Sequence, residues 1–242
     1  DVAYHSDKIE RKYKHLINIL GADHTGYIKR ISAAVSALSD KKIKFNCKVC
    51  QLVKLYKNGK PFKMSKRAGD FITVEDLLSE VNKDAIRFMM LNRSNDAELD
   101  FDFEKVKEKT KENPVYYVQY AYARINSITR TLKKKLSDKI LIENKSFNPN
   151  EYEKKILRKI FEWPKIIESA SYKLEPHKIP FYLYELSTLF HSYWSKGNED
   201  KNYRFLENDK VKRLETLAFI YLTAIVIKNG MNILGVSLPE KM

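Results

Sequence analysis

The sequence predicts an α/β fold in its first part and an all-α fold in the rest. Apolar runs at residues 15–20 and 43–56 flank a helix-like stretch at 28–38, which is the order of a parallel βαβ unit. After residue 113 the apolar residues recur at helical spacing instead. A chain of 242 residues is long enough to hold two such regions.

The elements that follow the βαβ unit are predicted from turn and capping residues. Asn58 and Gly59 mark a turn, and a lysine-rich loop covers residues 60–69. Thr73, with Asp76 three residues later, has the pattern of a helix start. Two short helices are therefore expected at residues 74–81 and 84–92.

The helical region begins at Asn113 and Pro114, a helix-capping residue followed by a proline at the first helical position. One apolar stripe follows at helical spacing, formed by Val118, Ala121, Ile125, Ile128, Leu132 and Leu136. Further helices are expected at residues 151–161, 180–194 and 210–228, with Asn229 and Gly230 ending the last one. The pattern predicts a helical bundle.

The charge balance indicates a polyanionic partner. Lys and Arg number 45 against 31 Asp and Glu, which gives a net charge of +14 spread over both regions. A field of this sign attracts nucleic acids. The sequence contains no signal peptide pattern and no long uninterrupted apolar run, so we expect a cytoplasmic protein with no membrane partner.

Three residues with side chains that could bind a metal are interpreted as structural. Cys47 and Cys50 lie three residues apart in a predicted strand, where their side chains point to opposite faces and cannot share a metal. We expect both to be buried free thiols and expect no protein-bound metal. His191 is expected to be packed or to lie on a helix surface.

The loop at residues 63–67 has the sequence Lys-Met-Ser-Lys-Arg. It could assist a reaction at a phosphate group, because flexible cations stabilise the negative charge that develops on a phosphate chain. A basic loop on its own is more often only solvated. This loop, however, closely resembles the KMSKS signature of class I aminoacyl-tRNA synthetases, in the form found in arginyl-tRNA synthetases. Residues 1–5, 21–27, 113–124 and 234–242 resemble further blocks of that family.

The resemblance implies a fold and a domain division. Residues 1–72 would be the second half of a Rossmann-type class I catalytic domain, 73–112 connecting helices, and 113–242 a helical anticodon-binding domain. The His-Ile-Gly-His-type motif and the additional N-terminal domain of the family have no counterpart in the sequence. We therefore expect the C-terminal portion of a longer synthetase.

The resemblance also implies functional residues. The loop residues Lys63, Ser65 and Lys66 would be catalytic. ATP would be bound by Gly21, Asp23, His24, Gly26, Met64 and Lys66. Arginine would be bound by Asp1, Tyr4 and Asp23, since a guanidinium is recognised by carboxylates. tRNA would be bound by Tyr116, Gln119, Tyr120, Arg124 and Met242.

Local physics leaves two of these assignments open. Asp23 and His24 also fit a helix N-cap, and Asp23 could contact either ribose or arginine. Tyrosines on a bundle helix are often core residues, so we expect half of Tyr116, Tyr117, Tyr120 and Tyr122 to be packed.

The activity implied is the ATP-dependent activation of arginine and its transfer to tRNA-Arg. Mg²⁺ would accompany ATP as part of that substrate, and we expect a monomer. The chain by itself should not activate arginine, because half of the nucleotide site is missing. An alternative is a non-enzymatic tRNA-binding module or truncated paralogue, and another is a basic helical protein with no role in RNA binding.

Overall fold

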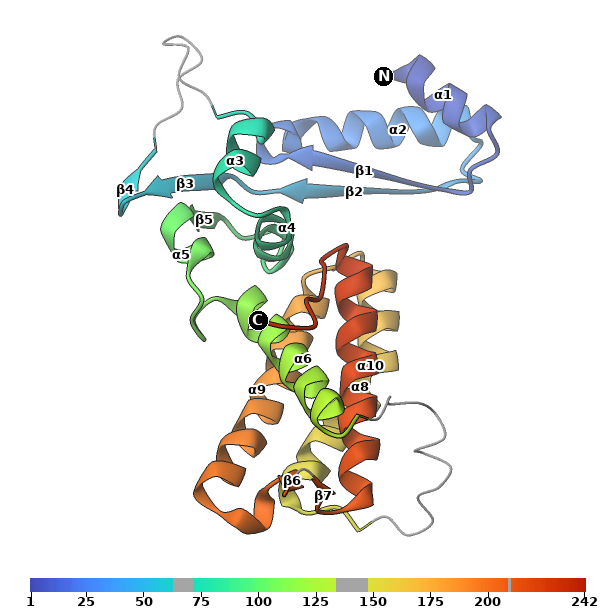
Figure 1. Ribbon diagram of the computed structural model, residues 1–242. Coiled ribbons are helices and arrows are strands. Elements are labelled where there is room, and N and C mark those ends of the chain that lie inside the picture. Colours follow the sequence, from blue (N-terminus) through green and yellow to red (C-terminus); the bar gives the residue numbers. More distant parts are fainter. Residues whose placement is uncertain (63–71, 134–147, 209) are drawn as a thin grey trace.

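The computed structural model describes residues 1–62, 72–133, 148–208 and 210–242. Its elements form a βαβ unit at the N-terminus, a small mixed segment, and a helical bundle below them in the view of Figure 1. This arrangement confirms the predicted order of an α/β region followed by an all-α region.

The N-terminal unit is a two-stranded parallel sheet covered on one face. Its elements are α1 (Val2–Glu10), β1 (His15–Gly21), the short 3-10 helix η1 (Ala22–Tyr27), α2 (Ile28–Leu38) and β2 (Lys44–Cys50). His15 pairs with Lys44 and Gly21 with Cys50. Leu16 packs under Ile31 and Val35 of α2 because alternate strand residues face the same side.

The middle segment contains three short strands and three short helices: β3 (Val53–Lys57), β4 (Lys60–Pro61), α3 (Val74–Glu80), α4 (Lys83–Leu91), β5 (Leu99–Asp102) and α5 (Phe103–Lys107). β3 pairs antiparallel to β4 and parallel to β5. The predicted strand at residues 43–56 was wrong in being continuous, since it is divided after Cys50. At this point the chain leaves the first sheet, and the backbone N–H of Gln51 donates to the Asn95 carbonyl instead.

Capping residues and one strand in the middle segment show what local sequence signals can and cannot find. Thr73 and Asp76 form a capping box at α3, as their spacing predicts. β5 was not predicted, because a four-residue strand gives too little periodicity to distinguish it from a loop. Its Phe101 is nevertheless completely buried.

The bundle contains four long helices and a small hairpin in the part of the chain that the structure describes. Its elements are α6 (Pro114–Thr131), α8 (Glu151–Lys173), α9 (Lys178–Glu199), η2 (Lys201–Tyr203), β6 (Leu206–Glu207), β7 (Lys210–Val211) and α10 (Leu214–Leu234). α8 and α9 are both longer than predicted. The last predicted helix was wrong at both ends, because residues 210–211 form β7 and α10 continues to Leu234.

The predicted helix end at Gly230 was wrong because this glycine has a packing role. A Cβ at Gly230 would lie 2.7 Å from Leu183 Cδ2, so the small residue lets α10 approach α9. The true C-terminal cap is Gly235, whose φ of 66° lies in the left-handed region that favours glycine.

One continuous apolar core joins the bundle to the middle segment. Phe88, Phe101 and Phe103 belong to the same buried cluster as Ile125 and Phe219. These described residues of the middle segment therefore pack on the bundle.

α10 is long and apolar enough to cross a membrane by length and composition alone. In this fold it lies against α4, α6, α8 and α9. Phe219, Ile227 and Met231 are completely buried there. The apolar character of α10 is accounted for by its place in the bundle core.

Candidate nucleic-acid interface and strand-end pocket

The loop predicted to contact ATP lies outside the described residues. Lys63, Met64, Ser65 and Lys66 all fall in the segment 63–71, which the structure does not describe. Their predicted roles therefore stay predictions.

The end of β1 presents an exposed carboxylate. Asp23 lies in η1, the short helix that begins directly after Gly21. His24 Nε2 lies 3.5 Å from Asp23 Oδ2. The helix-cap alternative was wrong, because the residue at the N-cap of η1 is Gly21 and no side chain caps this helix. The Asp23 carboxylate therefore remains open to a ligand from solvent.

The two glycines beside this carboxylate differ in their surroundings. A Cβ at Gly21 would lie 2.6 Å from Asp23 Oδ1, so glycine lets the carboxylate fold back over the strand end. A Cβ at Gly26 would lie in open space. Of these two glycines, only Gly21 lies where neighbouring described atoms leave no room for a side chain.

Asp1 and Tyr4 line a cavity of about 280 Å³ between α1, β1 and α2. The Tyr27 hydroxyl donates a hydrogen bond of 2.6 Å to Asp1 Oδ2, and Tyr4 is 60% exposed. Asp23 does not line this cavity. The structure thus brings together two of the three residues predicted to bind arginine, Asp1 and Tyr4, and leaves Asp23 outside the cavity, just beyond the end of β1.

A buried histidine supports the floor of this cavity. His5 Nδ1 donates to the Asp1 carbonyl at 2.8 Å, and His5 Nε2 accepts from Asn18 Nδ2 at 3.0 Å. Burial lowers the pKa of His5, which keeps the ring neutral. Sequence reasoning missed His5, Asn18 and Tyr27, although His5 and Tyr27 end two of the family-like blocks.

The two cysteines differ from the prediction in one respect. Cys47 packs against the small core under α2, and burial raises the pKa of its thiol. Cys50 is exposed, so the expectation that both are buried was wrong for this residue. The strand alternation still places them on opposite faces. Among the described residues no group of three or more His, Cys, Asp and Glu side chains could hold a metal.

A cavity of about 440 Å³ opens beside α6, and three of the five predicted tRNA contacts line it. Tyr120 and Arg124 reach it from α6 and Met242 from the C-terminal tail. Its complete lining is Tyr120, Ala123, Arg124, Ser127, Arg130, Trp194, Lys241 and Met242. This set contains three cationic side chains, two large aromatic rings and no Asp or Glu.

Arg124 is the central side chain of this cavity. Its guanidinium carbon lies 4.3 Å from the centroid of the Tyr120 ring and 5.2 Å from a ring centroid of Trp194, within the range of cation-π attraction. Nη2 donates to the Tyr120 hydroxyl at 3.1 Å, and Nη1 donates to His191 Nδ1 at 3.0 Å. No carboxylate of the described residues forms an ion pair with it.

Tyr116 and Gln119 line a neighbouring cavity of about 390 Å³, which Met242 also lines. Tyr116 stacks on Tyr120, with ring centroids 5.8 Å apart. Gln119 Nε2 donates to the Ser237 carbonyl at 2.9 Å. Tyr117 and Tyr122 instead pack against the bundle, so two of the four tyrosines are packed.

The C-terminal tail is held beside α6 by backbone contacts. Arg130 Nη1 donates to the Glu240 carbonyl at 2.7 Å, and Arg87 Nε donates to the Leu234 carbonyl at 2.9 Å. Val236 is buried in the main core. These contacts place Lys241 and Met242 at the cavity, and only the folded bundle brings residue 242 next to residue 124.

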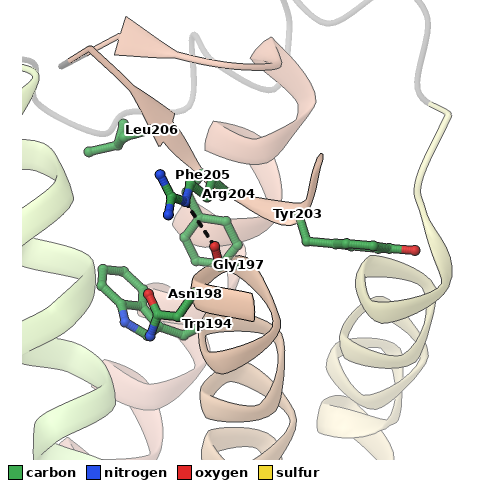
Figure 2. Close-up of a pocket in the computed structure, with 7 residues that line it drawn as sticks. All are labelled: Trp194, Gly197, Asn198, Tyr203, Arg204, Phe205 and Leu206. Carbon is green, nitrogen blue, oxygen red and sulfur yellow. Dashed lines mark hydrogen bonds between the residues drawn. The ribbon is translucent and has the colours of Figure 1, made fainter. Parts of the chain in front are cut away.

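Trp194 also lines a third cavity, of about 230 Å³, which Figure 2 shows. Arg204 Nε donates to the Gly197 carbonyl at 3.0 Å there. A Cβ at Gly197 would lie 3.0 Å from the Tyr203 carbonyl oxygen, so a larger residue would push the returning chain away from α9. Asn198 lies beside the Trp194 ring in the same view.

Sequence reasoning missed Trp194, Arg130 and Lys241 as cavity residues and predicted His191 only as a residue that is packed or lies on a helix surface. His191 is indeed buried, but it also contacts Arg124. His191 and Trp194 are three residues apart on α9, which places both on the face toward α6. That spacing was the available signal, and it has meaning only once the packing of α6 against α9 is known.

Comparison with known proteins agrees with this geometry. Residues 118–242 match the family model of the DALR anticodon binding domain, which is just over half of the chain. The chain belongs to this family of anticodon-binding domains. Over its whole length it is also similar to arginyl-tRNA synthetases, including the region that precedes the matched domain.

The individual similarities cover all or nearly all of this chain but only part of each relative. The chain is 60% identical to the arginine-tRNA ligase of Pelagibacter ubique and 48% identical to that of Ruegeria pomeroyi, and it spans 42% of each. A Campylobacter jejuni crystal structure, assigned as an arginyl-tRNA synthetase, superposes with a TM-score of 0.85 at 31% identity over all of this chain and 51% of that one. The structure of Thermus thermophilus arginyl-tRNA synthetase, at 19% identity and a TM-score of 0.64, shares the fold over 96% of this chain and 42% of its own.

Proposed function

We propose that this chain is the tRNA-binding part, with a portion of the catalytic domain, of an arginine-tRNA ligase. In the proposed division, residues 1–72 belong to the class I catalytic domain, 73–112 connect, and 113–242 bind the anticodon loop. The substrates would be ATP with its Mg²⁺, L-arginine and tRNA-Arg, acting in the cytoplasm with the protein as a monomer.

The observation that carries the proposal is the cavity beside α6. Arg124, Arg130 and Lys241 line it without an acidic side chain, and Tyr120 and Trp194 offer aromatic rings. Unpaired bases stack on aromatic rings, and arginine pairs with phosphates or base edges. The half-buried guanidinium of Arg124 has no carboxylate partner among the residues that the structure describes, and this favours an anionic ligand, because a cation removed from water needs compensation. An RNA loop supplies both the bases and the charge.

The proposed catalytic contribution lies at the end of β1. Asp23 and His24 would contact ATP at the carboxyl end of a parallel strand, where ligands bind in open α/β sheets. Lys63, Met64, Ser65 and Lys66 would then supply the KMSKS-like loop, with the lysines stabilising charge on the phosphates. Asp1 and Tyr4 would receive the arginine side chain in the adjoining cavity.

The RNA-binding part is tested with an anticodon stem-loop of tRNA-Arg and fluorescence anisotropy on the full chain. Arg124→Ala should weaken binding at least about tenfold and reduce the slope of log affinity against log salt by about one. Arg158→Ala, an exposed arginine of α8 that does not line the cavity, is the control with the same charge change. Equal losses in both variants, or equal binding of a stem-loop with a scrambled loop, would contradict the proposal.

The catalytic part is tested by arginine-dependent exchange of pyrophosphate into ATP. We expect the 242-residue chain to show no exchange, because its sequence lacks the His-Ile-Gly-His-type motif whose histidines assist adenylation in this family. Exchange by the purified chain would contradict the proposed division of the active site.

A further inference from the structure

We propose that His191 is a positioning residue for RNA, which accepts a hydrogen bond from Arg124 and so holds the guanidinium against the Tyr120 and Trp194 rings. The inference rests on the proposed function, because it assigns a role within the same cavity.

The His191 ring is fixed on both of its nitrogen atoms. Nε2 donates to the Tyr117 carbonyl at 3.1 Å, which leaves the lone pair of Nδ1 for the 3.0 Å bond from Arg124 Nη1. The side chain is 5% exposed, and its ring lies 4.3 Å from Tyr117 and 5.7 Å from Tyr120 between centroids. Packing and hydrogen bonding together define one ring orientation.

A neutral acceptor has an advantage over a carboxylate at this position. A carboxylate would also orient the guanidinium, but it would neutralise the charge that an RNA phosphate needs. Burial lowers the pKa of His191 to about 4, so the ring is uncharged at neutral pH and can accept from Arg124. The histidine therefore orients the cation and leaves its charge available.

Orientation also leaves donors free for the ligand. A guanidinium carries five N–H groups, and the contacts to His191 and Tyr120 use one on Nη1 and one on Nη2. The arginine side chain has many rotamers in solution, and a fixed side chain does not lose this freedom again on binding. Affinity is therefore gained without a direct contact between His191 and RNA.

Two substitutions separate the two bonds of the ring. In His191→Asn the amide reaches the position of Nδ1 and keeps an acceptor for Arg124. In His191→Gln the longer amide reaches the position of Nε2 and keeps a partner for the Tyr117 carbonyl. Binding of the anticodon stem-loop is measured by anisotropy for both variants. We expect His191→Asn to bind within about threefold of the unaltered chain and His191→Gln to bind about tenfold more weakly, the loss of one charge-assisted hydrogen bond.

A second measurement couples His191 to Arg124. In the Arg124→Ala background His191→Gln should cause no further loss, since the group that it positions is absent. Urea unfolding followed by tryptophan fluorescence selects variants that are folded at the temperature of the binding assay. If His191→Gln does not fold, His191→Leu replaces it, because this change removes the acceptor for Arg124 and keeps an apolar side chain in the buried position, and it should also weaken binding about tenfold.

The outcomes distinguish the two proposals. If the unaltered chain does not bind the stem-loop, the proposed function fails. If Arg124→Ala weakens binding but His191→Gln binds like the unaltered chain, only the positioning role is wrong. Equal weakening by His191→Asn and His191→Gln, or additive losses with Arg124→Ala, would likewise overturn it in favour of a purely structural role.

Discussion

The βαβ unit and the helical bundle differ in how completely they bury their apolar residues. In the unit, Leu16, Ile31 and Val35 form a small core on one face of the sheet, while Ile19 on the other face is 72% exposed. That face borders an apolar cavity of about 440 Å³, which Ile167 and Ile233 of the bundle also line. The bundle has one continuous core that includes the middle segment. We infer that the bundle can be stable by itself, whereas the βαβ unit has only one face of its sheet covered by its own helices.

The largest difference in stability between the two regions is expected from substitutions in their cores. Phe219→Ala removes a completely buried ring from the bundle and should cost about 3–5 kcal/mol. Ile31→Ala removes a buried side chain from the small core of the unit. Both tryptophans, Trp163 and Trp194, lie in the bundle, so their fluorescence reports its unfolding in urea. We expect the fluorescence midpoint to fall in Phe219→Ala and to stay unchanged in Ile31→Ala.

The same experiment carries its own control. Far-UV circular dichroism follows both regions, and in Ile31→Ala it should show an early transition that fluorescence does not. A common shift of both signals in both variants would mean that the unit and the bundle unfold as one cooperative structure.

The next largest effect is expected at a buried carboxylate of the bundle. Both oxygens of Glu153 are hydrogen-bonded, since Oε1 accepts from the Tyr193 hydroxyl and Oε2 from the backbone N–H of Asn150. Oε2 also forms an ion pair with Arg213 Nη1 at 3.3 Å. Glu153→Ala should cost about 2–3 kcal/mol, because two hydrogen-bond donors and Arg213 lose a charged partner whose side chain is completely buried.

Its matched control is Glu151→Ala in the same first turn of α8. This exposed side chain interacts mainly with the helix dipole, so its loss should cost about 0.5 kcal/mol. Equal costs at the two positions, measured by urea unfolding, would show that the buried hydrogen bonds contribute little.

A pH dependence of similar size is expected in the stability of the bundle. Burial lowers the pKa of His191 to about 4 in the folded chain, against about 6.5 when unfolded. The unfolded chain thus takes up the proton first as pH falls, and stability that is complete above pH 6.5 is lost toward pH 4. By about pH 5 the loss should reach about 2 kcal/mol.

The comparison variant for this pH dependence is His191→Asn, which cannot titrate at this position. Tryptophan-monitored urea midpoints at pH 7.5 and 5 should differ less in the variant than in the unaltered chain. Identical pH dependence in the two would show that His191 contributes nothing to it. Other titrating groups are present in both chains and cancel in the difference.

The smallest expected effect lies at the strand end of the unit. Gly21→Ala places a Cβ where Asp23 Oδ1 now lies, 2.6 Å away, but that oxygen belongs to an exposed side chain that can move. We expect a change in stability below about 1 kcal/mol, measured by circular dichroism. A larger loss would mean that the backbone itself is constrained there. Displacement of the carboxylate should, however, weaken the binding of any ligand that Asp23 contacts.

Individual residues show how far the sequence could predict the candidate site. Tyr120 and Arg124 were predicted because aromatic and basic side chains suited to RNA occur together on one expected helix, in a block that resembles the family. Trp194 and Lys241 were not found, since each approaches Arg124 only after α9 and the tail have packed beside α6. Resemblance to a family added Met242, which periodicity gives no reason to place there.

The amino-acid sequence by itself determined the local structure: the parallel βαβ order, the cap at Thr73, the start of α6 at Pro114 and the excess of positive charge. These depend on neighbours along the chain, whose spacing the sequence states directly. Tertiary structure alone decided that Phe101 forms a buried strand, that Gly230 is a packing residue inside α10, and that His191 accepts from Arg124. Each of these depends on residues distant in sequence, whose approach is set by the packing of the whole core.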